Sequence, residues 1–236
     1  MIKSFLNRSF NIDKNRVMRY TNNTMSNYAF IDASNLFYGG KKSLGWSIDY
    51  EKLKTYLSEK YGIAKVFYFG GVDIHQFPFN YLEHETVPLR ELKTYIEDYL
   101  TTHEANLTED KLSEIRQHLK RIRFYMKLEQ MGYTLILKPV KIFNTGESIA
   151  VRKANCDVDM TFYMMRERNA FDEILVLTGD GDFLPVLKYL REKNKQVLIL
   201  SRSEKTAKEL KQFAGGEFMD FHYIKKYILF EKENHS

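Results

Sequence analysis

The chain has 236 residues, of which 44% are hydrophobic and 28% charged, with a formal net charge of +5. This composition is sufficient for one sizeable hydrophobic core, and the small basic excess is only a weak indication of a polyanionic partner. The single cysteine, Cys156, excludes an intramolecular disulfide, and no apolar run approaches the roughly 18 residues of a membrane span. We therefore expect a cytoplasmic protein without membrane contact.

Residues 1–27 differ from the rest of the chain because they are rich in asparagine and basic residues and show no periodic pattern. A disordered N-terminal extension is the prediction for this segment, with a transit peptide as the alternative. From Tyr28 onward, apolar runs alternate with helical patterns.

The first predicted elements are two strands with a helix between them. An apolar run over residues 28–32 breaks at Asp32, and a β-prone run follows over residues 63–71. The helix between them begins near Asp49 and ends at Gly62, a residue type that favours the left-handed conformation at a helix end.

The stretch after the second strand is long for a single crossover and carries two apolar stripes at spacings of three and four residues. We predict a helical hairpin over residues 86–130, inserted in one β–α–β crossover and standing outside the core, with Thr108 as a cap of its second helix. A basic flank runs beside the second stripe, either as a solvated face or as a contact surface for RNA phosphates. Its members are Arg116, Lys120, Arg123 and Lys127.

The remaining chain contains further strands separated by helical patterns. The strands are predicted at residues 132–138, 173–179, 195–201 and 217–221. Helices are predicted in the segment DVDMTFYMMRERN and near residues 182–193 and 204–213. Strands that alternate with helices predict an α/β fold with a central parallel sheet covered on both faces.

Aspartates are placed where these apolar segments end. Because the carboxyl ends of parallel strands share one edge of a sheet, we expect Asp32 and Asp180 to lie at the same edge. Carboxylates that gather there repel one another unless a cation neutralises them, which indicates a site for Mg²⁺ or Mn²⁺. Capping of a helix start is an equal alternative for Asp159 or Asp182 alone. The full candidate set is Asp32, Asp157, Asp159, Asp180 and Asp182.

Several motifs together resemble one protein family. FIDASNL, KANCDVDM and LVLTGDGDFLPVLKYLREKNKQVLIL, followed by SEKTAKELKQFAGGEFMDF, resemble the NYN domain family, in its LabA-like branch of the PIN-like nuclease superfamily. The resemblance covers residues 28–223 and leaves residues 224–236 as a C-terminal helix or tail. It implies a PIN-like three-layer α/β/α sandwich with a central parallel sheet. It also implies an acidic pocket for Mg²⁺ or Mn²⁺ and, in active members, hydrolysis of RNA phosphodiester bonds.

The resemblance assigns residues position by position. Asp32 matches the first-strand aspartate, Asn35 matches its polar partner, and Asp157 matches the aspartate that opens the central helix. Many relatives carry a further aspartate about two turns into that helix, where this chain has Tyr163, and Asp159 is placed to compensate in part. The family's (S/T)GDxDF segment is matched by Thr178, Asp180 and Asp182.

These residues predict a metal-dependent ribonuclease. Asp32, Asp157 and Asp180 would hold the cation that activates a water, and Asp182 or Asp159 would position that water or hold a second ion. Arg152 and Lys153 are either contacts for the RNA backbone or ordinary surface charges.

The open alternatives are a non-catalytic RNA- or protein-binding module with the same fold, and a phosphatase of small phosphate esters. A homodimer is compatible with the resemblance.

Overall fold

The computed structural model describes most of the chain. The described residues are 26–33, 45–143, 151–154 and 156–231. The predicted N-terminal extension therefore lies almost entirely outside the described residues.

Six parallel strands form the central sheet of the described chain, in the order β3–β2–β1–β6–β7–β8. The inner strands are buried on both faces because their sequences are nearly continuous apolar runs. The predicted parallel sheet is thus confirmed. Its strands are β1 (Ser26–Asp32), β2 (Ile63–Val72), β3 (Thr134–Pro139), β6 (Phe171–Leu177), β7 (Gln196–Ser201) and β8 (Phe218–Asp220).

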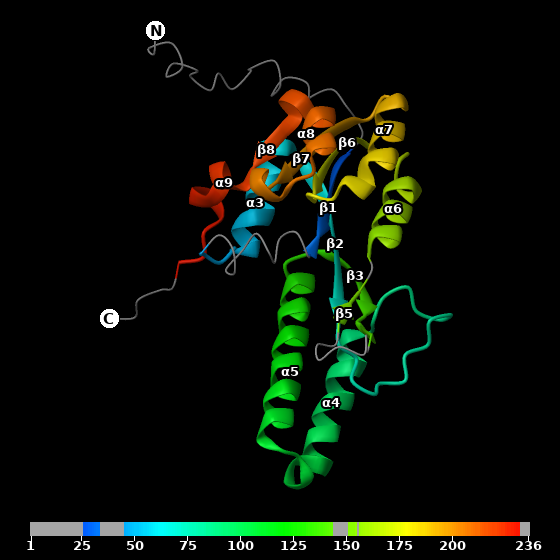
Figure 1. The fold of residues 1–236 in the computed structure, drawn as a ribbon, viewed down its shortest axis with the longest axis vertical. Coiled ribbons are helices and arrows are strands. Elements are labelled where there is room, and N and C mark those ends of the chain that lie inside the picture. The colour runs from blue at the N-terminus through cyan, green and yellow to red at the C-terminus, as the bar shows by residue number, and fades with distance from the viewer. Residues whose placement is uncertain (1–25, 34–44, 144–150, 155, 232–236) are drawn as a thin grey trace.

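Helices cover both faces of this sheet (Figure 1). Alternate residues of one strand pack into opposite layers, so Ile31 lies with α3, α4, α5 and α9, whereas Phe30 lies with α6, α7 and α8. The three-layer α/β/α arrangement is therefore confirmed. The helices are α3 (Tyr50–Tyr61), α4 (Leu89–His103), α5 (Glu109–Gln130), α6 (Asp157–Arg166), α7 (Leu184–Glu192), α8 (Lys208–Ala214) and α9 (Phe221–Ile228), with 3-10 turns η1 (Glu104–Asn106), η2 (Gly181–Phe183), η3 (Ser203–Lys205) and η4 (Gly215–Glu217).

Local capping accounts for the predicted ends of α3. The Asp49 side chain accepts hydrogen bonds from the amides of Glu51 and Lys52, each at 3.0 Å. Gly62 ends the helix with φ 64°, the left-handed conformation in which glycine is not strained.

The predicted helical hairpin is formed by α4 and α5, which run side by side and extend past the strands (Figure 1). Its apolar stripes do not form a separate unit, because Ile96 and Ile122 belong to the same hydrophobic cluster as Ile31. The Tyr125 hydroxyl also donates a hydrogen bond of 2.8 Å to the carbonyl of Gly71 in β2. The expectation that the hairpin stands outside the core is therefore wrong for the C-terminal half of α5.

Two features were not predicted in detail. Short strands β4 (Lys141–Phe143) and β5 (Val151–Lys153) pair in antiparallel fashion between β3 and α6. Helix α9 packs on α3, and the Asp49 amide donates to the carbonyl of Ile228 at 2.8 Å. The expected domain boundary at residue 223 falls inside this helix.

Candidate functional site

The strand order places a reversal of connectivity between β1 and β6. In an open α/β sheet, the carboxyl ends of the strands at such a reversal form the usual ligand-binding crevice. Ile31 and Leu177 are register partners there, so the residues that follow them, Asp32 and Thr178, leave the sheet side by side. This edge is where the sequence predicted that Asp32 and Asp180 would lie together.

A hydrogen-bonded threonine joins the two segments. The Thr178 hydroxyl is buried and donates to Oδ2 of Asp32 at 3.3 Å. The hydroxyl oxygen of Thr178 in turn accepts a hydrogen bond from the amide of Asp180 at 3.2 Å. Thr178 therefore fixes the orientation of the Asp32 carboxylate without adding a charge.

The first turn of α6 brings two more carboxylates to this edge. Asp157 and Asp159 are half-buried and lie directly after Cys156. Burial raises the pKa of the Cys156 thiol to about 12, and the negative charges of Asp159, Asp32 and Asp157 add to the effect. Three carboxylates from two distant segments thus contribute to the raised pKa of one thiol.

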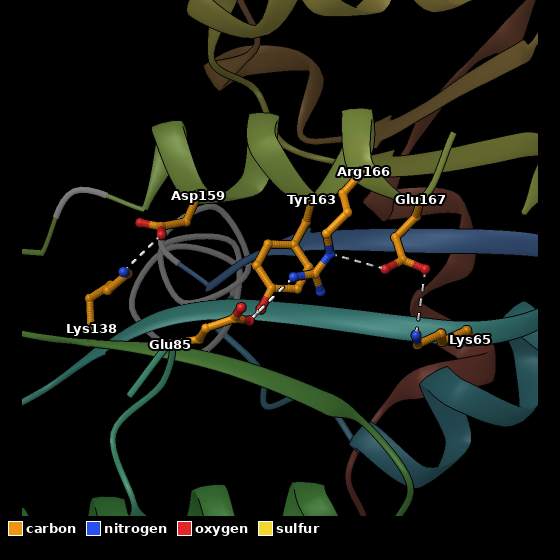
Figure 2. A network of polar contacts seen from close by, with 7 residues as sticks. All are labelled: Lys65, Glu85, Lys138, Asp159, Tyr163, Arg166 and Glu167. Carbon is orange, nitrogen blue, oxygen red and sulfur yellow. Dashed lines mark hydrogen bonds and ion pairs between the residues drawn. The ribbon is translucent and has the colours of Figure 1, made fainter. Parts of the chain in front are cut away.

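A lysine also belongs to this acidic site. Nζ of Lys138 lies 2.8 Å from Oδ1 of Asp159, and Figure 2 shows the lysine reaching the start of α6. Strand alternation explains this position, because Lys138 follows Ile136 on the face of β3 that packs against α6. Sequence analysis did not select Lys138. The available signal was its place as the penultimate residue of a strand that ends at the carboxyl edge.

The GDGD segment forms a cap at the exposed rim of the site. Oδ1 of Asp180 accepts a hydrogen bond from the Asp182 amide at 2.9 Å, and both side chains are exposed. Gly181 leaves room for Glu209 of α8, whose carboxylate lies where a β-carbon would otherwise be. Glu209 is thus a further acid at this rim that sequence analysis missed.

The position of the expected additional aspartate is occupied by a hydrogen-bonded phenol (Figure 2). The Tyr163 hydroxyl donates to Oε2 of Glu85 at 2.7 Å, and Nη1 of Arg166 lies 3.2 Å from the same oxygen. Cζ of Arg166 lies 3.8 Å from the centre of the Tyr163 ring. Burial, followed by the hydrogen bond to Glu85, raises the pKa of Tyr163 to about 12. The side chain at this position is therefore neutral at physiological pH.

The donor chemistry fits a hard divalent cation, since carboxylate oxygens predominate. Within the residues that the structure describes, however, no group of three or more His, Cys, Asp or Glu side chains is arranged so that it could hold a metal ion. In this structure Asp159 faces Lys138, and Asp180 accepts a hydrogen bond from the Asp182 amide.

Three further candidate residues, Asn35, Arg152 and Lys153, have no described side-chain contacts. Asn35 lies outside the described residues, and Arg152 and Lys153 lie in β5, a few residues before α6. These assignments stay predictions.

The basic flank of α5 is partly paired within the hairpin. Arg116 lies 2.9 Å from Glu104, and Arg123 lies 3.2 Å from Glu97. Lys120 and Lys127 are exposed.

In the described part of the chain, every helix is too short or too polar to cross a membrane.

The chain is similar in sequence to known proteins. The family model of the NYN domain matches residues 28–223. Low amplitude and bright protein LabA of Synechococcus elongatus is 29% identical over 103 residues, which are 43% of this chain and 55% of the relative. The chain thus aligns with only about half the length of this curated relative.

Two solved structures resemble this chain to different degrees. A protein of unknown function from Vibrio parahaemolyticus has a TM-score of 0.55 and 15% identity, with 87% of this chain and 97% of that chain covered. The T5 D15 protein, co-crystallised with metal ions, has a TM-score of 0.40 and 13% identity, with coverage of 79% and 59%. The first likeness supports the fold alone, and the second score is too low to support a conclusion.

Proposed function

The chain belongs to the NYN domain family, and from this premise we propose that it is a metal-dependent ribonuclease that hydrolyses RNA phosphodiester bonds at the carboxyl edge of the sheet. Family membership supports a nuclease-type function. The observation that carries the proposal is the meeting of Asp32 with the Thr178 segment at the carboxyl edge, where the Thr178 hydroxyl donates to Asp32 at 3.3 Å, together with the two aspartates in the first turn of α6. Charges of one sign gathered from distant segments are costly unless the site binds a cation.

Asp32, Asp157 and Asp180 are the residues that we propose to hold Mg²⁺ or Mn²⁺, with Asp159 or Asp182 available for a second role. When bound, such a cation supplies an activated water and stabilises the charge that develops on the phosphate. Thr178 keeps the Asp32 carboxylate oriented toward the site.

Substrate positioning is assigned to cations beside the acidic edge. Arg152 and Lys153, just before α6, would attract the RNA backbone toward a pocket that otherwise repels it. Lys120 and Lys127 on the exposed flank of α5 would extend this contact along the hairpin.

One observation favours a second candidate function. The neutral Tyr163 stands at the position of an acid in many relatives, and it is held by Glu85 and Arg166. A module with the same fold that binds RNA or protein without cutting it would tolerate this change.

A cleavage assay separates the two functions. The full chain is incubated with labelled RNA and labelled DNA, with Mn²⁺ or with EDTA, beside the variants Asp32→Asn and Asp172→Asn. Asp172 serves as the matched control because it lies near the amino end of β6, where it pairs with Lys195 at 3.4 Å.

We expect Mn²⁺-dependent cleavage of RNA by the unchanged chain and by Asp172→Asn, and cleavage at least about 100-fold slower by Asp32→Asn. Equal cleavage by the unchanged chain and Asp32→Asn would indicate a contaminating nuclease. RNA that is bound equally well in EDTA and never cut would instead support the binding module.

A further inference from the structure

We propose that α9 and the side of α3 against which it packs form a contact surface for single-stranded nucleic acid, in which tyrosine rings stack on bases and lysines bind phosphates. This surface, the α9 platform, consists of Tyr223, Lys226, Tyr227, Phe230, Tyr56 and Lys60. No residue of the acidic edge belongs to it. The platform is therefore a second site that goes beyond the proposed function.

Helix α9 has one buried face and one exposed aromatic face. The buried face packs in the cluster that also contains α3, and its residues are Phe221, Ile224 and Ile228. On the exposed side, Tyr223, Tyr227 and Phe230 are 67%, 49% and 51% exposed. Tyr223 and Tyr227 are four residues apart and so are neighbours on the helix surface. Single exposed rings are ordinary, but three within residues 223–230 indicate an interaction site.

The ring of Tyr227 is stacked on the ring of Tyr56 from α3. The ring centres are 5.2 Å apart, and the planes are inclined by 25°. Because Tyr56 is buried, it holds the Tyr227 ring in place and leaves the exposed part of that ring turned outward. The Lys60 ammonium donates a hydrogen bond of 2.8 Å to the Tyr56 hydroxyl and so fixes this pair further. A ring that is already oriented loses little conformational entropy when a base stacks on it.

The lysines of this region lie against rings instead of carboxylates. Nζ of Lys226 lies 4.8 Å from the centre of the Tyr227 ring, and Nζ of Lys225 lies 5.8 Å from the centre of the Trp46 ring. Within the described residues, no carboxylate pairs with Lys60, Lys225 or Lys226. A phosphate that binds these ammonium groups therefore displaces only weak cation–ring contacts.

The acids near the platform are turned away from it or are already paired. Glu51 and Glu59 of α3 line a hollow with Met131, which lies just after α5. Glu231, at the end of the described chain, lies 3.8 Å from Lys52. The platform thus has an excess of positive charge, which complements a phosphate backbone.

Rings interleaved with lysines are the chemistry that binds single strands, because base faces stack on the rings while backbone phosphates bind the cations. A duplex keeps its base faces covered and could use only the lysines. The flexible stem of Lys226 lets its ammonium move from the Tyr227 ring to a phosphate when a base takes its place. These contacts favour a single strand over a duplex.

The platform ends near the carboxyl edge of the sheet. Helix α3 connects the parallel strands β1 and β2, so it begins at the carboxyl edge and returns to the amino edge. The carbonyl of Ile228, at the end of α9, accepts a hydrogen bond of 2.8 Å from the amide of Asp49 at the start of α3. Figure 1 shows both helices on the side of the sheet away from α6 and α7. A strand bound along α9 would therefore lead toward the carboxyl edge.

Helix α7 provides a matched control on the opposite layer. Tyr189 is 37% exposed, and Nζ of Lys193 lies 5.3 Å from the centre of its ring. The pair repeats the contact of Tyr227 with Lys226, but among the described residues no second ring packs on Tyr189. If any exposed tyrosine beside a lysine attracts nucleic acid equally, the two pairs should behave alike.

The test is fluorescence anisotropy of the full chain with labelled single-stranded RNA and with the same RNA as a duplex, in EDTA. Tyr227→Ala should raise the Kd for the single strand about tenfold, whereas Tyr227→Phe and Tyr189→Ala should match the unchanged chain. Duplex binding should be weaker and should not change in Tyr227→Ala. Thermal melting shows which variants are folded.

Salt dependence gives a readout that does not require the alanine variant to fold. Lys226→Gln should reduce the slope of log affinity against log salt concentration by about 0.7, and Lys193→Gln should leave it unchanged. Equal losses in Tyr227→Ala and Tyr189→Ala, equal affinity for single strand and duplex, or no binding of RNA would overturn the inference. Binding to phosphatidylserine vesicles that depends on Tyr227, without binding to RNA, would assign the surface to a membrane and also overturn it.

The outcomes separate this inference from the proposed function. Asp32→Asn should bind the single strand at least as tightly as the unchanged chain, because Asp32 does not belong to the platform. Binding that depends on Tyr227 in a chain that never cuts RNA would support the platform and reject the ribonuclease. Mn²⁺-dependent cleavage with binding that is independent of Tyr227 would do the reverse.

Discussion

The acidic edge and the hairpin flank are both rich in charge, but the charges are arranged in opposite ways. At the edge, Asp32 comes from β1 while Asp157 and Asp159 come from α6, and the charges of all three contribute to the raised pKa of the half-buried Cys156 thiol. Along the hairpin flank, Arg116 and Arg123 each face an acid of a neighbouring segment, at 2.9 Å from Glu104 and 3.2 Å from Glu97.

This difference helps to separate function from structure. Exposed pairs of opposite charge cost little to form and contribute little, so they are the ordinary state of a solvated helix face. A group of like charges assembled from distant segments destabilises the fold unless a ligand compensates it. Lys138 supplies part of that compensation at the edge. The comparison therefore assigns chemistry to the edge and, at most, substrate guidance to the hairpin.

The largest expected effect is on the free energy of unfolding, from a residue that anchors the hairpin to the core. Ile122 of α5 is fully buried in the cluster shared with the sheet. Ile122→Ala should lower the free energy of unfolding by about 2–5 kcal/mol, because it removes buried methyl groups and leaves a cavity. Urea denaturation of the full chain measures the change, with the exposed Gln117→Ala on the same helix as control. A loss no larger than that of the control would show that the hairpin is independent of the core.

The next prediction compares acids at two helix starts. Asp157 opens α6 at the edge, and Asp110 lies in the first turn of α5 in the hairpin. In EDTA, Asp110→Asn should lose a helix-dipole contribution of about 0.3–1 kcal/mol, whereas in Asp157→Asn the relief of repulsion from Asp32 and Asp159 should offset this loss. With Mn²⁺ at 100 times its Kd, the unchanged chain and Asp110→Asn should gain about 2.7 kcal/mol, whereas Asp157→Asn should lose most of this gain. Scanning calorimetry with and without Mn²⁺ measures both effects. An equal gain in both variants would remove Asp157 from the site.

The sequence was sufficient for the elements whose signals are local. The caps at Asp49 and Gly62 and the apolar runs around Ile31 and Val176 determine helix ends and buried strands without reference to the rest of the fold. The meeting of Asp32 with the Thr178 segment followed from one further rule, the common edge of parallel strands.

Contacts made only by tertiary packing could not be predicted in this way. In the sequence, Lys138 is an ordinary charged residue of a strand. Its contact with Asp159 forms only when α6 packs on β3. Glu85 lies in the segment before α4, so its bond to Tyr163 depends on how that segment folds back across the sheet. Strands β4 and β5 have three residues each, which is too short for a periodic signal.

A smaller effect is expected from the exposed cations of the hairpin. Lys120→Glu with Lys127→Glu changes the charge of the flank and leaves the arginine pairs intact. If the flank guides RNA, KM should rise several-fold and its dependence on salt should become shallower, while kcat is unchanged. Steady-state cleavage at several salt concentrations measures this. The control Lys188→Glu with Lys193→Glu makes the same charge change around α7. An equal rise in KM in both double variants would show that net charge, and not the hairpin flank, causes the effect.

The smallest effect is expected from neutralising one acid of the hairpin's exposed ion pairs. Glu97 lies 2.7 Å from Lys93 and 3.2 Å from Arg123. The hydrogen bond from Lys93 is the main cause that lowers the pKa of Glu97 below its ordinary value of 4.5, and Arg123 adds to it. Because the Glu97 side chain is more than a third exposed, solvent screens these contacts, and Glu97→Gln should cost only a few tenths of a kcal/mol at pH 7.

The sign of the pH dependence follows from the direction of that pKa shift. A carboxyl group whose folded-state pKa is lowered stabilises the fold above its unfolded-state pKa and loses this contribution as pH falls through the folded-state value. The difference in melting temperature between Glu97→Gln and the unchanged chain should therefore be present at pH 7, shrink below about pH 4.5 and shrink again in high salt. Asp98→Asn, at the next position of α4, is the control. A loss of several kcal/mol, or one that persists at low pH, would show that the hairpin charges are not the balanced, solvated set that distinguishes them from the acidic edge.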